Sequence, residues 1–292
     1  MNAFQFLTPS TLEEALALLD EHGDDAKVMA GGTALVIMLK QRLLVPDVVI
    51  SLDRVPGLAE IAVEQNRLHL GGLATHRAAE QALPVRQHVP VLADTYHHVA
   101  TIRIRNVATV AGSIAHADPN QDPPITLLAL DAQVRIVSAN GQRDVALNDF
   151  FTDYYETVLE PEELVTGVHL PVPEPHTGSA YCKFLPRSAD DYATVGVAAS
   201  VRINPDTGAA EDCRIAMGCV GVTPLRAMEA EAIVRGQVRT EALLREAGAV
   251  AKGVTDPIGD TRGSAAYKRD MAGVFVQRAL DQAWQHAQAT VS

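Results

Sequence analysis

The sequence predicts an α+β protein, and three observations carry this expectation. The chain has 292 residues, 47% of them apolar and 21% charged, which is enough to bury a sizeable core in two or three packed units. The first fifty residues alternate helical periodicity with short apolar runs, as in a helix–strand–helix–strand unit. Beyond residue 177, three strand-like segments precede three helical ones, which is the order of elements in an α+β unit.

The first unit is expected to span residues 1–55. The pattern Ser10-Thr11-Leu12-Glu13 fits a capping box, and leucines at helical spacing then continue a helix to Gly23. After it we expect a strand at 27–29, a helix from the following bend to about residue 43, and a buried strand at 48–52.

The second unit is expected to span residues 56–176, starting at Pro56-Gly57. Segment 108–124 is predicted to be a long loop, and Arg103 and Arg105 before it are predicted to be exposed residues of a strand. The other expected elements are strands at 60–64, 67–70, 133–137 and 164–170, and helices at 75–83, 89–99 and 125–130.

A proline-rich linker at 171–178 separates off a third unit, residues 177–292. We expect an antiparallel sheet with packed helices here, because a hairpin turn at 204–208 joins two of its strands. The expected strands are 180–185, 193–203 and 213–221, and the expected helices are 224–234, 240–252 and 265–286.

Charge and cysteine usage exclude several classes of function. The net charge is −12, from 36 acidic and 24 basic residues, which argues against nucleic acid or an anionic membrane as partner. The first seven residues do not form a signal peptide, and no apolar stretch is long enough to span a bilayer. Cys182, Cys213 and Cys219 lack CxxC spacing, which indicates reduced thiols in a cytoplasmic protein that cannot ligate an iron–sulfur cluster unaided.

The most informative stretch is a glycine bend after the first strand. An apolar run stops at Gly31-Gly32 and resumes with helix-forming residues, so backbone N–H groups near a helix start can face outward. Such a bend can hold a phosphate without a cationic side chain. The alternative is a tight strand-to-helix turn that binds nothing. The stretch consists of Val28, Met29, Ala30, Gly31, Gly32, Thr33, Ala34 and Leu35.

A second small-residue segment lies eighty residues further on. Thr109, Gly112 and Ser113 offer backbone donors and hydroxyls, while Asp118 and Asp122 offer acceptors suited to sugar hydroxyls. The alternative for Asp122 is a cap of the helix from residue 125. Together the two segments have the parts to bind a dinucleotide, although neither GxGxxG nor GxxxxGK[ST] occurs in the chain.

Three ordered motifs resemble one known family. They are Ala30-Gly31-Gly32-Thr33, Thr109-Val110-Ala111-Gly112-Ser113 with His116-Ala117-Asp118-Pro119 and Asp122, and Lys183-Phe184-Leu185-Pro186-Arg187 with Asp190-Asp191-Tyr192-Ala193-Thr194. The chain resembles, nearly end to end, the FAD-binding medium subunit of molybdenum hydroxylases, the xanthine dehydrogenase family that includes the flavoprotein subunit of aerobic carbon monoxide dehydrogenase.

The resemblance implies a two-subdomain, PCMH-type FAD-binding domain followed by a C-terminal flavoprotein domain. Residues 30–34 would carry the FAD pyrophosphate, and Val28, Met29 and Leu35 would flank it. The resemblance further implies that Thr109, Ala111, Gly112 and Ser113 contact pyrophosphate and ribityl, Asp122 a sugar hydroxyl, Lys183 the polar edge of the flavin, and Tyr192 one face of the ring.

Two residues depart from the family pattern. Ala34 stands where relatives often have Ser or Asp, so one side-chain hydrogen bond would be missing. Ala111 stands where Gly is usual, and alanine at positive φ would cost on the order of 1 kcal/mol. We therefore predict a negative φ at Ala111 and no loss of cofactor.

The function that the resemblance implies is electron transfer within a heterotrimeric oxidoreductase that assembles as a dimer of heterotrimers. FAD on this chain would take electrons from [2Fe-2S] clusters of a small subunit, while a large subunit would hold the molybdopterin cofactor. No catalytic acid or base and no metal-ligand spacing is evident in this chain. The alternatives are a free-standing FAD-dependent oxidoreductase and a non-catalytic assembly subunit, and the sequence fixes neither the substrate nor the electron acceptor.

Overall fold

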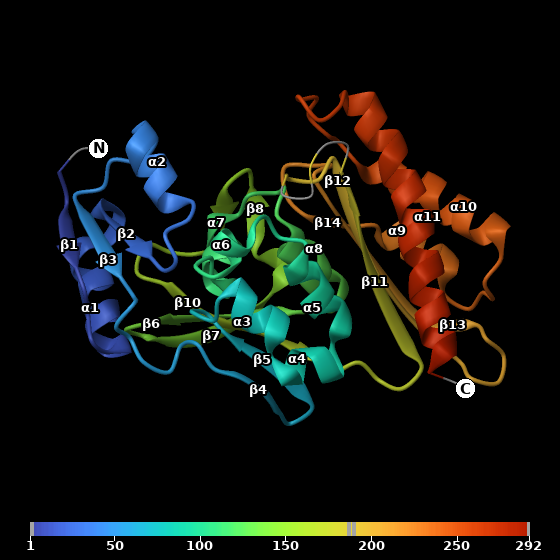
Figure 1. The fold of residues 1–292 in the computed structure, drawn as a ribbon, viewed down its shortest axis with the longest axis horizontal. Helices are drawn as coiled ribbons and strands as arrows, with labels where there is room; N and C mark the ends of the chain where they lie inside the picture. The colour runs from blue at the N-terminus through green and yellow to red at the C-terminus, as the bar shows by residue number, and fades with distance from the viewer. Residues whose placement is uncertain (1–2, 186–187, 189–190, 291–292) are drawn as a thin grey trace.

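The computed structural model describes residues 3–185, 188 and 191–290, so Pro186, Arg187 and Asp190 of the third motif lie outside the described residues. In the described residues, three sheets of three to five strands follow one another along the chain, each with its own helices, and a two-stranded sheet lies in the second segment (Figure 1). The predicted α+β class is confirmed. Each of these sheets takes its strands from one of the segments 1–55, 56–176 and 177–292, and we keep that division as a proposal.

The N-terminal segment is a parallel three-stranded sheet with strand order β1-β3-β2, packed against α1. Thr11 caps α1 by accepting from the Glu14 N–H, and the Glu14 carboxylate accepts from Ser10, so the capping box starts one residue later than predicted. Sequence patterns missed β1. The elements are β1 (Gln5–Leu7), α1 (Leu12–His22), η1 (Gly23–Asp25), β2 (Ala26–Met29), α2 (Leu35–Gln41) and β3 (Val48–Ser51).

The middle segment is an antiparallel five-stranded sheet of order β4-β5-β10-β6-β7, with helices over one side (Figure 1). The predicted strands are confirmed, whereas α4, β7 and the β8–β9 hairpin were not predicted. The elements are β4 (Ile61–Glu64), β5 (Arg67–Gly71), α3 (His76–Gln81), α4 (Leu83–His88), α5 (Pro90–His97), α6 (Ile102–Arg105), α7 (Val110–His116), α8 (Asp122–Ala129), β6 (Gln133–Ser138), β7 (Gly141–Ala146), η2 (Leu147–Asp149), β8 (Phe151–Asp153), β9 (Glu156–Thr157) and β10 (Leu164–Pro171).

Two predictions about this segment are wrong. The expected loop at 108–124 consists largely of helix α7 and the start of α8, because Thr109 caps α7 by accepting from the Gly112 N–H. The expected strand around Arg103 and Arg105 is helix α6, and only Arg103 of the two is exposed. Arg105 is buried because it pairs with the carboxylate of Glu80 at 3.1 Å.

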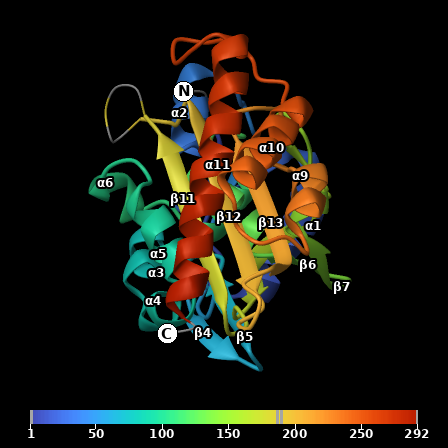
Figure 2. The same ribbon diagram turned by 90° about the vertical axis from the view of Figure 1, so that its right-hand side faces the viewer.

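The C-terminal segment is an antiparallel sheet of order β11-β12-β13-β14, and α11 runs along one face of it (Figure 2). No helix among residues 3–185 and 191–290 is long and apolar enough to cross a membrane. The predicted strands and helices are confirmed, except that the expected helix at 224–234 begins only at residue 228, because residues 225–226 form the unpredicted strand β14, which pairs with β13. The elements are β11 (Thr177–Phe184), β12 (Val195–Ile203), β13 (Ala210–Gly218), β14 (Leu225–Arg226), α9 (Met228–Val234), α10 (Glu241–Ala251), η3 (Lys252–Val254) and α11 (Ala265–Ala289).

Glycines allow the C-terminal sheet to be approached closely from both faces. A Cβ atom on Gly178 would lie 2.1 Å from the carbonyl oxygen of Ala283 in α11. On the other face, Ile125 of α8 occupies a socket over Gly196 and Gly218, which are paired across β12 and β13. Since α8 also packs on α5, it joins the middle segment to the C-terminal sheet.

We expect Gly178→Ala to destabilise the protein by about 1–3 kcal/mol or more, because the added methyl group meets helix backbone that cannot rotate away. Urea unfolding followed by far-UV circular dichroism measures the change. Gly253→Ala is the matched control, since a Cβ there meets nothing within 4 Å and φ is not positive. Equal unfolding midpoints for the two variants would contradict the packing described.

Candidate functional site

The glycine bend lies against the middle segment of the chain. A Cβ atom on Gly31 would be 1.9 Å from the carbonyl oxygen of Val107, and Gly32 has φ +71°. A Cβ atom on Gly112 would be 4.0 Å from the Cβ of Ala30. Both glycines of the bend are therefore required by geometry, one by close contact and one by a left-handed backbone. The two segments singled out in the sequence meet in space.

The bend keeps its backbone donors free. Within the described part of the chain, no N–H group of residues 30–35 donates a hydrogen bond, although the Gly32 and Ala34 carbonyls accept bonds from the first turns of α2. These residues are half-buried. Ala34 precedes α2 and makes no side-chain cap, as expected for the residue that replaces Ser or Asp. Val28 and Met29 end β2, and Leu35 begins α2. The bend therefore offers a row of unpaired amides at a helix start, which is a structure suited to an anion.

The second segment offers fewer free amides than its sequence predicted. In α7, the N–H groups of Val110 and Ala111 donate to the carbonyl oxygens of Ala74 and Gly72, and that of Gly112 donates to Thr109 Oγ1. Ser113 Oγ donates to the Val110 carbonyl. What remains is the Thr109 hydroxyl proton and the acceptor lone pairs of Ser113. Ala111 has a helical backbone with negative φ, as predicted.

Helix α6 is held by a buried ion pair, and it in turn positions Val107 against the bend. Arg105 Nε lies 3.1 Å from Glu80 Oε2, and Arg105 Nη1 donates to the carbonyl oxygens of Val99 and Ala100 at 2.9 Å. Ala100 has φ +40°, so the guanidinium bonds fix a strained turn. The contact between Gly31 and Val107 thus depends on an arginine that the sequence did not place in the site.

A buried histidine holds the start of α7. His76 Nε2 lies 3.1 Å from the carbonyl oxygen of Thr109, and the His76 N–H donates to the Ala108 carbonyl. Burial lowers the pKa of His76 to about 4, so the ring is neutral at pH 7 and donates from Nε2. The centroids of the His76 and Tyr96 rings are 5.1 Å apart.

Asp122 and Lys183, predicted to meet different parts of a cofactor, are each other's partner. Lys183 Nζ lies 2.8 Å from Asp122 Oδ2 and 2.9 Å from the carbonyl oxygen of His98, and the Tyr181 hydroxyl donates to Asp122 Oδ1. The Lys183 and Asp122 side chains are only 2% and 5% exposed. Burial raises the pKa of Asp122, against the opposing effect of Lys183 and Tyr181. Asp122 is the first residue of α8 and makes no side-chain cap, so neither sequence interpretation describes its contacts.

Tyr192 lies between β11 and β12 and is 48% exposed. Its hydroxyl lies within hydrogen-bonding reach of Asp118, which is 5% exposed and also close to the hydroxyl of Tyr155. Burial and the charge of Asp118 raise the pKa of Tyr192, so the phenol is protonated. The sequence motifs do not assign a cofactor contact to Asp118, and no motif marks Tyr155.

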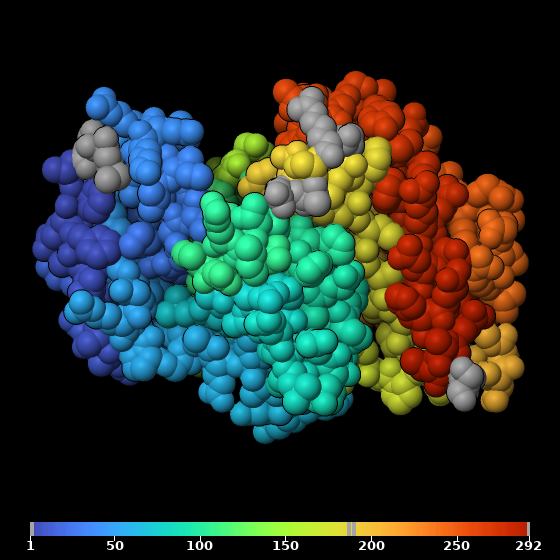
Figure 3. All heavy atoms as spheres, viewed as in Figure 1, coloured from blue at the N-terminus to red at the C-terminus, as the bar shows by residue number. Residues whose placement is uncertain are grey.

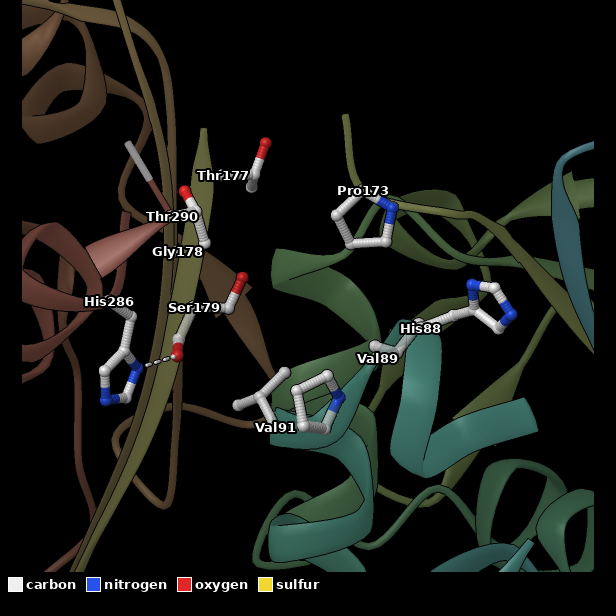
Figure 4. A pocket seen from close by; sticks show the side chains of 10 residues that line it. His88, Val89, Val91, Pro173, Thr177, Gly178, Ser179, His286 and Thr290 are labelled. Carbon is white, nitrogen blue, oxygen red and sulfur yellow. Dashed lines mark hydrogen bonds between the residues drawn. The ribbon is translucent and has the colours of Figure 1, made fainter. Parts of the chain in front are cut away.

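Figure 3 shows a hollow between the blue N-terminal segment and the yellow and orange C-terminal segments, with green segments as its floor. A separate cavity of about 320 Å³ opens between α5 and β11 (Figure 4). It is lined by Val89, Val91, Pro173 and His286 among others, and contains none of the predicted site residues. The cavity in Figure 4 is therefore not the candidate site.

Comparison with known proteins identifies the family of the whole chain. The family model of the FAD binding domain in molybdopterin dehydrogenase matches residues 2–173, and that of the CO dehydrogenase flavoprotein C-terminal domain matches residues 180–283. The carbon monoxide dehydrogenase medium chain of Hydrogenophaga pseudoflava is 34% identical over 96% of this chain and 97% of that one. The 6-hydroxypseudooxynicotine dehydrogenase complex subunit alpha of Paenarthrobacter nicotinovorans is 33% identical over 99% and 97%. The solved structure of carbon monoxide dehydrogenase from Hydrogenophaga pseudoflava matches with a TM-score of 0.94 and 35% identity, over 98% of both chains.

Replacing Lys183 by methionine should destabilise the protein by about 3–5 kcal/mol, because Asp122 would remain buried without its cation. Urea unfolding at pH 7 measures this. Lys252→Met is the control, since its ion pair with Asp270 is exposed and should contribute at most about 1 kcal/mol. A loss for Lys183→Met no larger than for the control would mean that the buried pair does not join the two segments.

Acidification should weaken the fold through His76. Its folded pKa of about 4 lies below the unfolded value of about 6.5, so the unfolded state binds the proton first and stability falls as pH drops from 6.5 toward 4. This group contributes a slope of up to about 1.4 kcal/mol per pH unit in that window. Urea unfolding at several pH values should show a shallower slope for His76→Gln and an unchanged slope for the exposed His88→Gln. Identical slopes in all three proteins would refute the assignment.

Proposed function

The chain belongs to the family of FAD-binding subunits of molybdenum hydroxylases, and we propose that it carries electrons from iron–sulfur clusters of a partner subunit through FAD to an external acceptor. The family makes it an oxidoreductase subunit with an FAD-binding domain. Electron transfer and the partners are the proposal. Flavin supplies the redox chemistry when bound, so the chain needs to hold, orient and shield it.

The observation that carries the proposal is the unpaired bend at 30–35. Its amides lie at the start of α2 and lack partners within the described residues. Gly31 has no room for a Cβ atom, so the two subdomains close on each other there. A diphosphate would accept from these amides with charge-assisted hydrogen bonds. The residues present therefore fit FAD.

We propose distinct roles for the remaining site residues. The Thr109 hydroxyl would add a donor beside the bend, and Ala111, Gly112 and Ser113 would keep that donor in place through α7. Tyr192 would offer a flat, half-exposed surface for stacking on the flavin. Asp122 and Lys183 would form the wall beside the cofactor, with their charges already satisfied by each other.

A partner supplies what this chain lacks. All three cysteines are buried and free, and burial raises the pKa of Cys182 to about 11 and of Cys219 to about 12, so these thiols are poor metal ligands. A small [2Fe-2S] subunit and a large molybdopterin subunit, in a dimer of heterotrimers, would provide the clusters and the molybdenum centre. Exposed Ile102, Ile104 and Val107 on and after α6 are apolar surface beside the bend. The free thiols support a cytoplasmic location.

Neither alternative function is favoured. A free-standing oxidoreductase would need an acid or base beside the flavin, whereas Asp122 is already paired with Lys183 and Glu80 with Arg105. An assembly subunit with a decayed site would not be expected to keep free amides and a sterically required glycine. Relatives named for carbon monoxide and for 6-hydroxypseudooxynicotine are equally similar, so the substrate and acceptor of the complex are not assigned.

Gly31→Ala should weaken FAD binding by at least about tenfold, because the methyl group would push the bend away from Val107 and misdirect its amides. Titration of the FAD-free chain with FAD, followed by flavin fluorescence, measures the dissociation constant. Gly253→Ala should bind FAD as the wild type does. A wild-type chain that binds no FAD would defeat the proposed function itself.

Electron transfer is tested on the complex isolated from its own host. Native mass spectrometry should show iron–sulfur and molybdenum subunits bound to this chain. Anaerobic mixing of the reduced iron–sulfur subunit with the FAD-loaded chain should then bleach flavin absorbance. Isolation of the chain without partners, or stable flavin absorbance after mixing, would favour the free-standing alternative.

A further inference from the structure

A turn far along the chain, residues 260–263, lies against Tyr192. The guanidinium carbon of Arg262 lies 5.7 Å from the centroid of the Tyr192 ring, over its face. An arginine over an aromatic face is attracted by the ring electrons, with an energy that grows as the pair is desolvated. Arg262 is 23% exposed, so the cation is partly withdrawn from water. One face of the ring is therefore taken by this chain.

The turn is built to hold Arg262 in this position. Asp260 and Gly263 bond each other's backbone, and Asp260 accepts from the Arg262 N–H at 2.8 Å and from its side chain at 2.7 Å. Lys268 Nζ, on a side chain that is 3% exposed, lies 3.0 Å from the same carboxylate. Although burial opposes it, hydrogen bonds from Arg262 and Lys268 lower the pKa of Asp260 to about 2, so the anchor stays ionised. Two cations therefore share one fixed carboxylate.

The turn is also tied to the strand that follows Tyr192. The hydroxyl of Thr194, two residues after Tyr192 and fully buried, donates to the Arg262 carbonyl at 3.3 Å. At the other end of the phenol, Asp118 lies within hydrogen-bonding reach of the hydroxyl. Arg262 thus covers one face of the ring, and the turn that carries Arg262 is bonded to Thr194, while Tyr192 remains 48% exposed.

We propose that Arg262 is a positioning residue for FAD, which fixes the ring of Tyr192 so that its open face receives the flavin. This inference rests on the proposed function, because it takes Tyr192 as the stacking residue. Arg262 acts through Tyr192, and Asp260 and Lys268 act through Arg262. None of the three has to touch the cofactor.

A double-mutant cycle tests the proposal on the full chain. Arg262→Gln should raise the FAD dissociation constant about 2- to 5-fold in the wild-type background, matching the energy of a cation–π contact. In a Tyr192→Ala background the same substitution should change nothing further, because its target is gone. Visible circular dichroism of bound FAD should change with Arg262→Gln and recover in part with Arg262→Lys. A purely structural turn would alter thermal stability and leave the flavin spectrum as it is.

Arg269→Gln is the matched control, since Arg269 pairs with the fully exposed Asp256 near the start of α11. Equal weakening of FAD binding by Arg262→Gln in both backgrounds, or no weakening in either, would overturn the proposal for Arg262. FAD affinity unaffected by Tyr192→Ala would instead overturn the stacking role on which it rests. A wild-type chain without FAD affinity would remove the proposed function altogether.

Discussion

The structure depends on one close backbone contact, that of Gly31 with Val107. The carbonyl oxygen of Val107 occupies the space where any side chain of residue 31 would begin. The bend lies against this carbonyl, and its amides remain unpaired within the described residues. A buried backbone donor without a partner is costly, so such a row persists where water or a ligand can reach it. The fold therefore keeps a binding capacity that its own chain does not use.

The C-terminal segment completes the site through packing that leaves little freedom. Ile125 sits over Gly196 and Gly218, and the adjacent Asp122 pairs with Lys183 of β11. The Cys219 N–H donates to the Pro119 carbonyl, which ties the turn before α8 to the sheet. These contacts all join α8 and the turn before it to the C-terminal sheet. They therefore fix the position of Tyr192 relative to α7. A binding site between the segments would thus be preorganised, because these contacts fix the distance between the segments in the absence of the cofactor.

Sequence patterns predicted the elements with strong periodicity and missed those defined by tertiary contacts. The long strands β12 and β13 and the helices α10 and α11 are apolar at regular spacing, and they were found. Strand β7 has mostly exposed, polar residues, so its sequence lacks the apolar pattern that predicts a strand. The alanines, glycine and serine of α7 predict a loop, because small residues are typical of connectors. The start of this helix is instead set by Thr109, His76 and Gly72, from different parts of the chain.

Among the site residues, too, those defined by local sequence could be predicted, and those defined by tertiary contacts could not. The glycine bend could be found because its chemistry is local, since adjacent glycines alone permit the left-handed φ and the close approach. The pairing of Asp122 with Lys183 could not be found, because the two are 61 residues apart and each looks like a free ligand in sequence. The same holds for Arg105 with Glu80, which are 25 residues apart. Arg262 and Asp260 are only two residues apart, but the sequence does not show that their turn lies against Tyr192. Lys183, Arg105 and Arg262 are thus each paired with a carboxylate, which leaves the unpaired backbone amides of the bend as the partners offered to a diphosphate.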